Sequence, residues 1–234
     1  MIARTPRRTP PAAPVASMAT PARQPAAPAR RARRFYRVAK RLLDLAVALT
    51  VLALLAPLYA LLAVIVVLDS GRPILYRREV VGLHGRTFRM YKFRTMTVNA
   101  EQLLLLDPDL LHAYTAQNFK LKRDPRVTPA GRFLRKFSLD ELPQLWNVVR
   151  GEMSLVGPRW IPSHEIEQLG ELAALRHSVP PGITGLWQVS GRSNTTWAER
   201  MRLDKEYVER CSLWLDLWIL LRTPFAILRA DGAY

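Results

Sequence analysis

The sequence predicts a mainly helical α+β protein, in which a re-entrant membrane helix hairpin precedes a soluble domain with a short β-hairpin and interfacial amphipathic helices. Three observations support this fold class: a long apolar stretch with a proline at its midpoint, two short strand-like segments around a glycine-flanked turn, and helix-capping signals in the second half. The 234 residues suffice for one ordinary domain once a basic tail is set aside. We therefore expect a tail over residues 1–34, a membrane-inserted segment over 35–70 and one folded domain over 71–234.

The N-terminal tail is strongly basic. Residues 1–41 contain ten arginines, one lysine and no acidic residue, so they carry eleven of the sixteen net positive charges. A segment of proline, alanine and arginine cannot offset its ordering entropy, and we expect residues 1–34 to be disordered. Basic residues near an anionic leaflet contribute about 1 kcal/mol each, so the tail either binds the membrane surface or is an inert extension. We expect no nucleic-acid partner, because residues 1–34 contain no aromatic residue that stacks on bases.

Residues 42–68 form the apolar stretch, whose only charge is Asp44. One straight helix of this length would measure ~40 Å, against ~30 Å of bilayer hydrocarbon. Pro57 removes a backbone donor and disfavours helical geometry at Ala56, which predicts a break between two arms of ~20 Å. Basic residues flank the stretch on both sides, and such residues stay on the cytoplasmic side of a membrane. We therefore expect a re-entrant hairpin in the cytoplasmic leaflet, with a tilted spanning helix as the alternative.

Two short segments, residues 73–76 and 87–96, read as strands around a turn at 82–85. Because side chains alternate along a strand, Lys92 and Arg94 are expected on one face and Tyr91 on the other. Two cations spaced in this way can bind a diphosphate, and the alternative is a charged edge strand exposed to solvent.

An acidic pair, Asp140 and Glu141, closes a capping-box pattern that begins at Ser138 and predicts a helix start at about residues 138–140. A helix N-terminus stabilises a carboxylate and attracts phosphate, so Asp140 is a candidate nucleophile beside a phosphoryl group. Adjacent helical residues point about 100° apart, so the two acids should have different roles, one attacking and one holding a metal. The alternative is that both merely cap the helix.

Arg159 follows Gly157 and Pro158 in a turn, and its fork geometry suits a phosphate, although a surface arginine without a role is equally open. Residues 97–123 read as a helical connection broken at Asp107, and residues 180–194 as a structured loop. Residues 196–199 cap the next helix. Residues 212–228 carry two tryptophans and a proline at 224, which predicts a broken interfacial helix or an ordinary buried one.

Five motifs, in this order along the chain, carry a family resemblance. They are KFRTM (92–96), DPRVT (124–128), SLDELPQLWNV (138–148), GEMSLVGPR (151–159) and PGITGLWQVSGR (181–192). They resemble the bacterial sugar transferase family, the monotopic polyprenyl-phosphate phosphoglycosyl transferases of undecaprenyl-phosphate hexose-1-phosphate transferase type. The resemblance runs from about residue 35 to residue 234.

The resemblance implies a catalytic domain that faces the cytoplasm at the bacterial inner membrane. Its substrates would be a UDP-sugar and polyprenyl (undecaprenyl) phosphate, and the reaction would be the first membrane step of exopolysaccharide, capsule or O-antigen synthesis. Asp140 would form a covalent phosphosugar intermediate, and Glu141 would bind Mg2+. Lys92, Arg94 and Arg159 would hold phosphates, with Asp124 supporting the site.

Two departures from the family pattern stand out. The family usually has Gln-x-Arg-x-Gly before the turn, where this chain has Arg78, Val80 and Gly82, and it commonly has proline where this chain has Trp160. A catalytically silent membrane scaffold of polysaccharide assembly is the competing function. The sequence leaves a homo-oligomer open.

Overall fold

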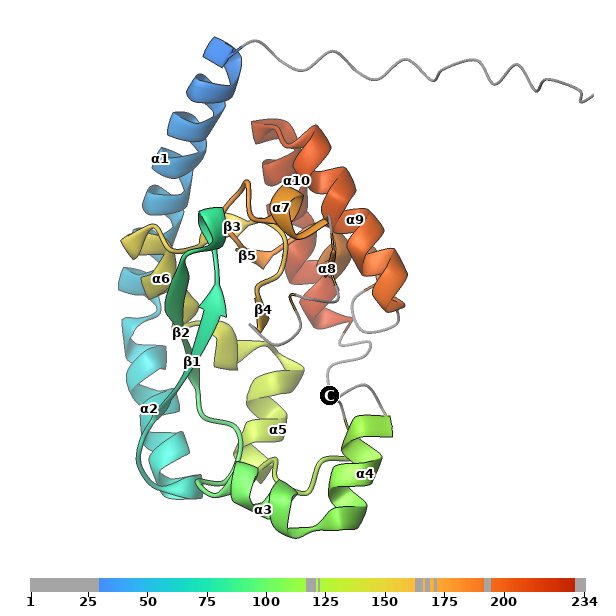
Figure 1. Cartoon of the computed structure of the whole chain (residues 1–234). Coiled ribbons are helices and arrows are strands. Elements are labelled where there is room, and N and C mark those ends of the chain that lie inside the picture. The colour runs from blue at the N-terminus through green and yellow to red at the C-terminus, as the bar shows by residue number, and fades with distance from the viewer. Residues whose placement is uncertain are drawn as a thin grey trace, which may run out of the picture.

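The computed structural model describes residues 30–116, 121, 123–162, 166, 169–170, 172–191 and 195–229, with side chains described from Arg34 onward. The predicted disordered tail therefore lies outside the described residues, apart from its last five positions. The helices are α1 (Arg30–Leu54), α2 (Ala56–Ser70), α3 (Ala100–Leu106), α4 (Pro108–Ala116), α5 (Pro129–Lys136), α6 (Gln144–Arg150), α7 (Leu172–Arg176), α8 (Leu186–Ser190), α9 (Trp197–Arg210) and α10 (Leu213–Leu228), with 3-10 turns η1 (Leu83–Gly85) and η2 (Leu139–Glu141). The strands are β1 (Leu75–Val81), β2 (Thr87–Phe93), β3 (Ser154–Val156), β4 (Ile161–Pro162) and β5 (Gly182–Thr184). The predicted mainly helical α+β class agrees with this architecture (Figure 1).

The first two helices form one bent pair. Their axes differ by 64° at a break that falls on Leu55, directly before Ala56 and Pro57. Pro57 lies in the first turn of α2, where a missing N–H is tolerated. In the described part of the chain no single helix has the length and apolarity to cross a membrane, whereas this bent pair meets both criteria when its two helices are taken together. A bend of this kind is compatible both with a re-entrant hairpin and with a broken spanning segment.

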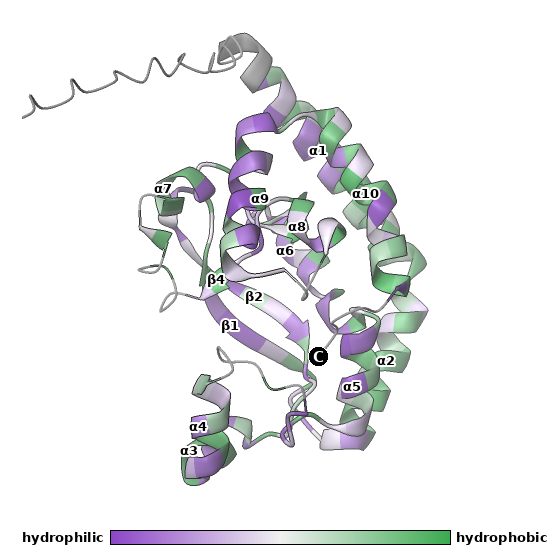
Figure 2. Ribbon diagram, turned by 90° about the vertical axis from the view of Figure 1, so that its right-hand side faces the viewer, coloured by the Kyte–Doolittle hydropathy of each residue, from purple (hydrophilic) through white to green (hydrophobic). Residues whose placement is uncertain are grey.

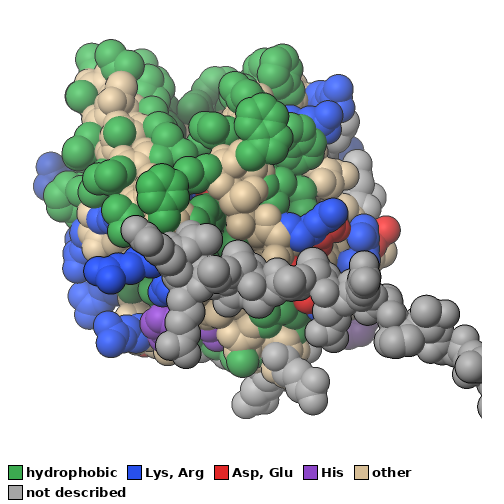
Figure 3. Space-filling view, turned by 90° about the horizontal axis from the view of Figure 1, so that it is seen from above, with side chains coloured by type: hydrophobic (Ala, Val, Ile, Leu, Met, Phe, Trp, Pro, Cys, Tyr) green, Lys and Arg blue, Asp and Glu red, His purple; other side chains and the backbone are tan. Residues whose placement is uncertain are grey.

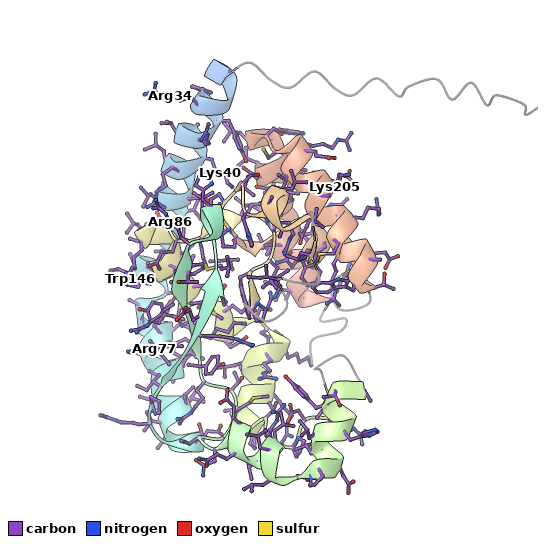
Figure 4. All side chains as sticks on the ribbon, in the orientation of Figure 1. Arg34, Lys40, Arg77, Arg86, Trp146 and Lys205 are labelled. Carbon is purple, nitrogen blue, oxygen red and sulfur yellow. The ribbon has the colours of Figure 1, made fainter. Side chains whose placement is uncertain are left out.

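Polar side chains from the first half of α1 point into the folded domain. The Lys40 ammonium lies 3.1 Å from the Asp216 carboxylate of α10, and both side chains are buried (Figure 4). Asp44 is also buried and accepts a hydrogen bond of 3.0 Å from the Leu155 backbone N–H. The Arg41 guanidinium donates to the last carbonyl groups of α6. Asp44, the one charged residue of the apolar stretch, therefore contacts the folded domain. The uncharged part of the stretch begins after Asp44.

The sheet is small. β1 pairs antiparallel with β2 and with β4, and a separate parallel pair joins β3 to β5. The two predicted strands exist, but β1 begins two residues later than expected and continues to Val81, and β2 ends at Phe93 rather than at Met96. This shorter second strand changes the position of Arg94. Its backbone N–H bonds to the Ile74 carbonyl just past the last ladder pair, where strand alternation no longer fixes its side chain.

The helix predicted at residues 138–140 begins differently. Ser138 adopts left-handed backbone angles (φ 55°, ψ 23°) and makes no side-chain cap, η2 follows as a single 3-10 turn, and α6 starts only at Gln144. The predicted capping box is therefore wrong here, because the Glu141 side chain is held by Lys92 and Arg159 instead. The second predicted box is confirmed at α9, where the Thr196 hydroxyl and the Glu199 carboxylate bond reciprocally to each other's backbone N–H.

Three further expectations meet the structure. The break at Asp107 is confirmed between α3 and α4. The segment 180–194, expected as a loop, contains β5 and α8, and α10 continues through Pro224 rather than breaking there. Inside α10 the Thr223 hydroxyl, one residue before the proline, donates to the Ile219 carbonyl at 2.8 Å.

One side of the molecule is apolar. In Figure 2, α1, α2 and α10 lie together along one edge and are largely hydrophobic, and Figure 3 shows hydrophobic side chains gathered in two ridges on the same side. We call this the apolar face; its exposed large side chains are Phe35, Val38, Leu42, Leu49, Leu54, Leu61, Val64 and Leu68 of the bent pair and Trp214, Leu217, Leu221, Phe225 and Leu228 of α10. An exposed apolar surface of this extent is typical of a membrane or protein contact.

Candidate active site

Four of the residues singled out in the sequence meet at one place. Asp140 and Glu141 lie on η2, Lys92 comes from β2, and Arg159 comes from the turn after β3. Asn147 fixes the strand against the helix that follows η2. Its amide oxygen accepts from the Tyr91 N–H at 3.2 Å, and its amide nitrogen donates to the Arg89 carbonyl at 2.7 Å. Both contacts lie just before Lys92 on β2 and hold this part of the strand against α6.

The Glu141 carboxylate is held by two cations. Its Oε1 lies 2.7 Å from the Lys92 ammonium and 2.7 Å from one Arg159 guanidinium nitrogen, while its Oε2 lies 3.5 Å from the other. Burial opposes ionisation of this carboxyl, but Arg159 and Lys92 outweigh burial and hold the Glu141 pKa well below its usual range. Glu141 is therefore a fixed anion with both oxygens occupied by positive partners.

Asp140 is bound much less tightly than its neighbour. Only 8% of the residue is exposed, and within the described residues its one ion-pair contact is the Lys92 ammonium at 3.9 Å. Burial raises the pKa of Asp140 and the Glu141 charge raises it further, whereas Lys92 and Arg135 oppose both. The two adjacent acids thus differ in environment, as their different predicted roles require.

The turn that presents Arg159 is fixed by close backbone packing. A Cβ added at Gly157 would lie 2.5 Å from the Pro180 carbonyl oxygen, so only glycine fits there. On the other side of the turn, the Arg176 guanidinium donates to the Arg159 carbonyl at 2.6 Å and pairs with buried Asp204 at 2.8 Å. Burial raises the pKa of Asp204 to about 6 although Arg176 opposes this. A pair from α7 and α9 thereby holds the backbone of Arg159.

Trp160 packs beside both cations of the site. The Lys92 ammonium lies 5.2 Å and the Arg159 guanidinium 5.3 Å from the centre of its indole ring. Both distances suit cation–π attraction. Within the described part of the chain, its indole N–H is buried and has no hydrogen-bond partner. Trp160 thus restricts the two side chains that hold Glu141.

Comparison with known proteins decides the family. The family model for bacterial sugar transferases matches residues 35–230, which is most of the chain. The chain belongs to the bacterial sugar transferase family. The site described above joins residues of three of the recognised motifs, KFRTM (92–96), SLDELPQLWNV (138–148) and GEMSLVGPR (151–159).

Several curated relatives are similar in sequence. The chain is 47% identical over 171 residues to undecaprenyl-phosphate galactose phosphotransferase of Salmonella typhimurium, which covers 72% of this chain and 36% of that relative. It is 49% identical over 174 residues to UDP-galactose-lipid carrier transferase of Erwinia amylovora, covering 73% and 36%. It is 41% identical over 174 residues to the exopolysaccharide production protein ExoY of Rhizobium meliloti, covering 73% and 76%. The chain thus spans about a third of the first two relatives and most of the third.

Two residues predicted for the sugar transferase site lie outside this cluster. The Arg94 guanidinium donates to the Ser70 carbonyl at 2.6 Å and to the Gly71 carbonyl, so it caps the end of α2 instead of pointing beside Lys92. Asp124 forms a forked ion pair with Arg126 at 2.8 and 2.6 Å. Burial opposes ionisation of Asp124, but the bonds from Arg126 hold its pKa below the usual value. The structure therefore brings together Lys92, Asp140, Glu141 and Arg159, and leaves Arg94 and Asp124 at the margin.

Arg135 was missed in the sequence. It lies on α5 and donates to the Thr95 hydroxyl at 2.9 Å. Burial lowers its pKa, while the charges of Asp140 and Asp124 oppose this, so it is the charge that links the nucleophile candidate to the Asp124 pair. In the sequence, Arg135 is distinguished only by its position next to Leu134 on an amphipathic helix. Surface arginines commonly occupy such positions, so the position does not identify a site residue.

Proposed function

We propose that this bacterial sugar transferase moves a hexose 1-phosphate from a UDP-sugar to polyprenyl phosphate, with undecaprenyl phosphate as the lipid. The observation that supports this most directly is the contrast between the acids: Glu141 is held by two cations, whereas among the described residues the one ion-pair contact of the Asp140 carboxylate is 3.9 Å long. A carboxylate without close hydrogen-bond donors retains its lone pairs for attack, and the neighbouring cations stabilise charge on a phosphoryl group.

The reaction on these residues has two steps. An Asp140 oxygen attacks the phosphorus that carries the sugar, the bond from this phosphorus to the bridging oxygen breaks, and UMP leaves with the electron pair. A phosphate oxygen of the polyprenyl phosphate then attacks the same phosphorus and releases the Asp140 carboxylate. Lys92 and Arg159 lie beside the acidic pair and would stabilise the phosphate charge, since catalysis of this kind rests on positioning and charge stabilisation.

The donor set suits Mg2+. In the described residues no group of three or more metal-binding side chains occurs, but Mg2+ is commonly held by one or two carboxylates together with substrate phosphates and water. Glu141, which is ionised, is the residue that would hold Mg2+. It would then give up part of its contact with Lys92 and Arg159. When bound, the ion would neutralise diphosphate charge and stabilise the leaving UMP.

The apolar face supports the membrane part of the proposal. The bent α1–α2 pair and α10 lie along one edge of the ribbon and are largely hydrophobic (Figure 2), and they carry the exposed side chains of the apolar face, whereas the Lys92 and Glu141 side chains of the site are mostly buried. We propose that this side inserts into the cytoplasmic leaflet of the inner membrane as a re-entrant hairpin, with the catalytic domain in the cytoplasm. We propose that the protein acts in polysaccharide assembly, because its relative ExoY is named for exopolysaccharide production.

The test is product formation in detergent with undecaprenyl phosphate, Mg2+ and radiolabelled UDP-galactose or UDP-glucose. We expect label in the organic phase, a loss of at least about 10³-fold in Asp140→Asn, and normal activity in Asp109→Asn, whose carboxylate lies exposed on α4. Normal cellular function of Asp140→Asn without product from any nucleotide sugar would instead support the scaffold reading.

A further inference from the structure

A cavity of about 230 Å³ lies between the active site and the apolar face. Its walls come from α1, α6, α8 and α10 and from β5, and most of the side chains that line it are apolar. Val51 of α1, Leu142 and Leu145 beside the acidic pair, and Leu220 and Ile227 of α10 are the main apolar members. The chemistry described so far uses none of these side chains.

The lining of the cavity joins two parts of the molecule. It includes Ser138 and Glu141, so the cavity reaches the catalytic pair. It also includes Thr223, Ala226 and Ile227 of α10, which are partly exposed and are neighbours in sequence of the exposed Phe225 and Leu228 of the apolar face. The apolar lining of the cavity therefore continues into the apolar face, the surface that we propose enters the membrane.

One wall is tied directly to the phosphate-binding turn. The Gly157 backbone N–H, two residues before Arg159, donates to the Thr184 carbonyl of β5 at 3.0 Å. The Thr184 hydroxyl lies 2.8 Å from the Thr223 hydroxyl of α10. The wall on α10, strand β5 and the arginine turn are thus one hydrogen-bonded unit, which fixes the distance between the cavity and the cations.

We propose that this cavity holds the first isoprene units of the acceptor lipid and so delivers its phosphate to Asp140. The inference rests on the proposed function and names the acceptor subsite of that site. Eight of the thirteen lining residues are apolar, so over most of the wall a sugar or a nucleobase would leave polar groups unpaired, whereas a prenyl chain needs only apolar contact there. The volume is below the ~300–1,000 Å³ that encloses a whole drug-sized ligand, which fits an occupant that leaves most of its chain in the bilayer.

The proposal is tested by filling the cavity. Ala226→Phe and Val51→Phe each add bulk to a different wall, and Ala53→Phe adds the same side chain at an exposed position of α1. We measure the KM for undecaprenyl phosphate in the full reaction. In the same preparations we measure formation of the covalent phosphosugar from UDP-sugar without lipid, which reports both folding and the first step.

The expected result is a rise in the KM for undecaprenyl phosphate of about tenfold in both cavity variants, corresponding to the loss of about two buried methylene groups. Ala53→Phe should keep the KM of the parent protein, and all three should form the covalent intermediate at the parent rate. An unchanged lipid KM in both cavity variants would overturn the assignment. Loss of the covalent intermediate in both, with normal Ala53→Phe, would also overturn it, because the cavity would then serve the donor half-reaction. If the parent protein forms no intermediate, the proposed function itself fails.

Discussion

The buried pair between Lys40 and Asp216 is expected to hold the bent α1–α2 pair onto the domain. Lys40 is 7% exposed, Asp216 is fully buried, and their charged atoms lie 3.1 Å apart. The Asp216 carboxylate also accepts hydrogen bonds from the Tyr36 hydroxyl at 2.9 Å and the Tyr207 hydroxyl at 2.7 Å. Lys40→Met would keep the length of the side chain and remove only the charge. It would leave a buried carboxylate without its cation.

The magnitude follows from that environment. Removing one partner of a buried ion pair costs about 3–5 kcal/mol. Because two tyrosine hydroxyls still donate to the carboxylate, we expect a cost near the lower limit, about 3 kcal/mol. For a chain of this size each kcal/mol corresponds to about 2–4 °C, so the Tm should fall by about 6–12 °C.

Thermal unfolding in detergent, followed by circular dichroism, measures this change. Arg34→Met is the matched control, because Arg34 is an exposed cation on the same helix (Figure 4) and its loss should change the Tm little. In a double-mutant cycle with Asp216→Asn, the double variant should be more stable than the sum of the single losses predicts by at least about 1 kcal/mol. A Tm change below about 2 °C in Lys40→Met, or fully additive losses, would refute the reasoning.

Three further predictions concern the site. Lys92→Met should move the acid limb of the UMP-release rate to higher pH, because burial already raises the pKa of Asp140 and Lys92 is the main group that opposes it. Arg176→Met should destabilise the protein more at pH 8 than at pH 5, since Asp204, with a pKa of about 6, is protonated and neutral below that value but a buried unpaired anion above it. Trp160→Ala should raise the KM for the UDP-sugar by about 3- to 30-fold through loss of two cation–π contacts, whereas Trp160→Phe should retain most of the affinity.

Each of these has a control and a contrary outcome. Lys205→Met removes an exposed lysine of α9 and should leave the pH profile in place, and an acid limb that stays fixed in Lys92→Met would show that Asp140 does not set it. An equal Tm loss of Arg176→Met at both pH values would remove the electrostatic explanation. Trp146→Ala deletes an exposed tryptophan and should leave the KM unchanged. An unchanged KM in Trp160→Ala would mean that the two cations keep their positions without the indole.

The residues that meet at the site were more predictable from the sequence than its local geometry. Lys92, Asp140, Glu141 and Arg159 were singled out from their residue types and the surrounding motifs, and the fold brings them together. The interpretation of residues 138–141 as a capping box failed, because ion pairs with partners far away in sequence outweigh a local cap. Local patterns do not reveal such partners.

The position of Arg94 shows a second limit. Strand alternation placed it beside Lys92, but β2 ends at Phe93, and the free carbonyl groups at the end of α2 then attract the guanidinium. Pro224 shows a third, since it was expected to break a helix that instead continues to Leu228. Strand ends and proline tolerance both depend on tertiary contacts, which a single sequence does not contain.

The central claim is that Asp140 forms a covalent bond to the phosphosugar. Purified protein is incubated with sugar-labelled UDP-galactose or UDP-glucose and Mg2+ without lipid, then denatured, and the label that stays on the protein is counted. The account predicts label on the parent protein and on Asp109→Asn, none on Asp140→Asn, and its release on addition of undecaprenyl phosphate. Label that persists on folded Asp140→Asn, or no label on any folded variant, would contradict it.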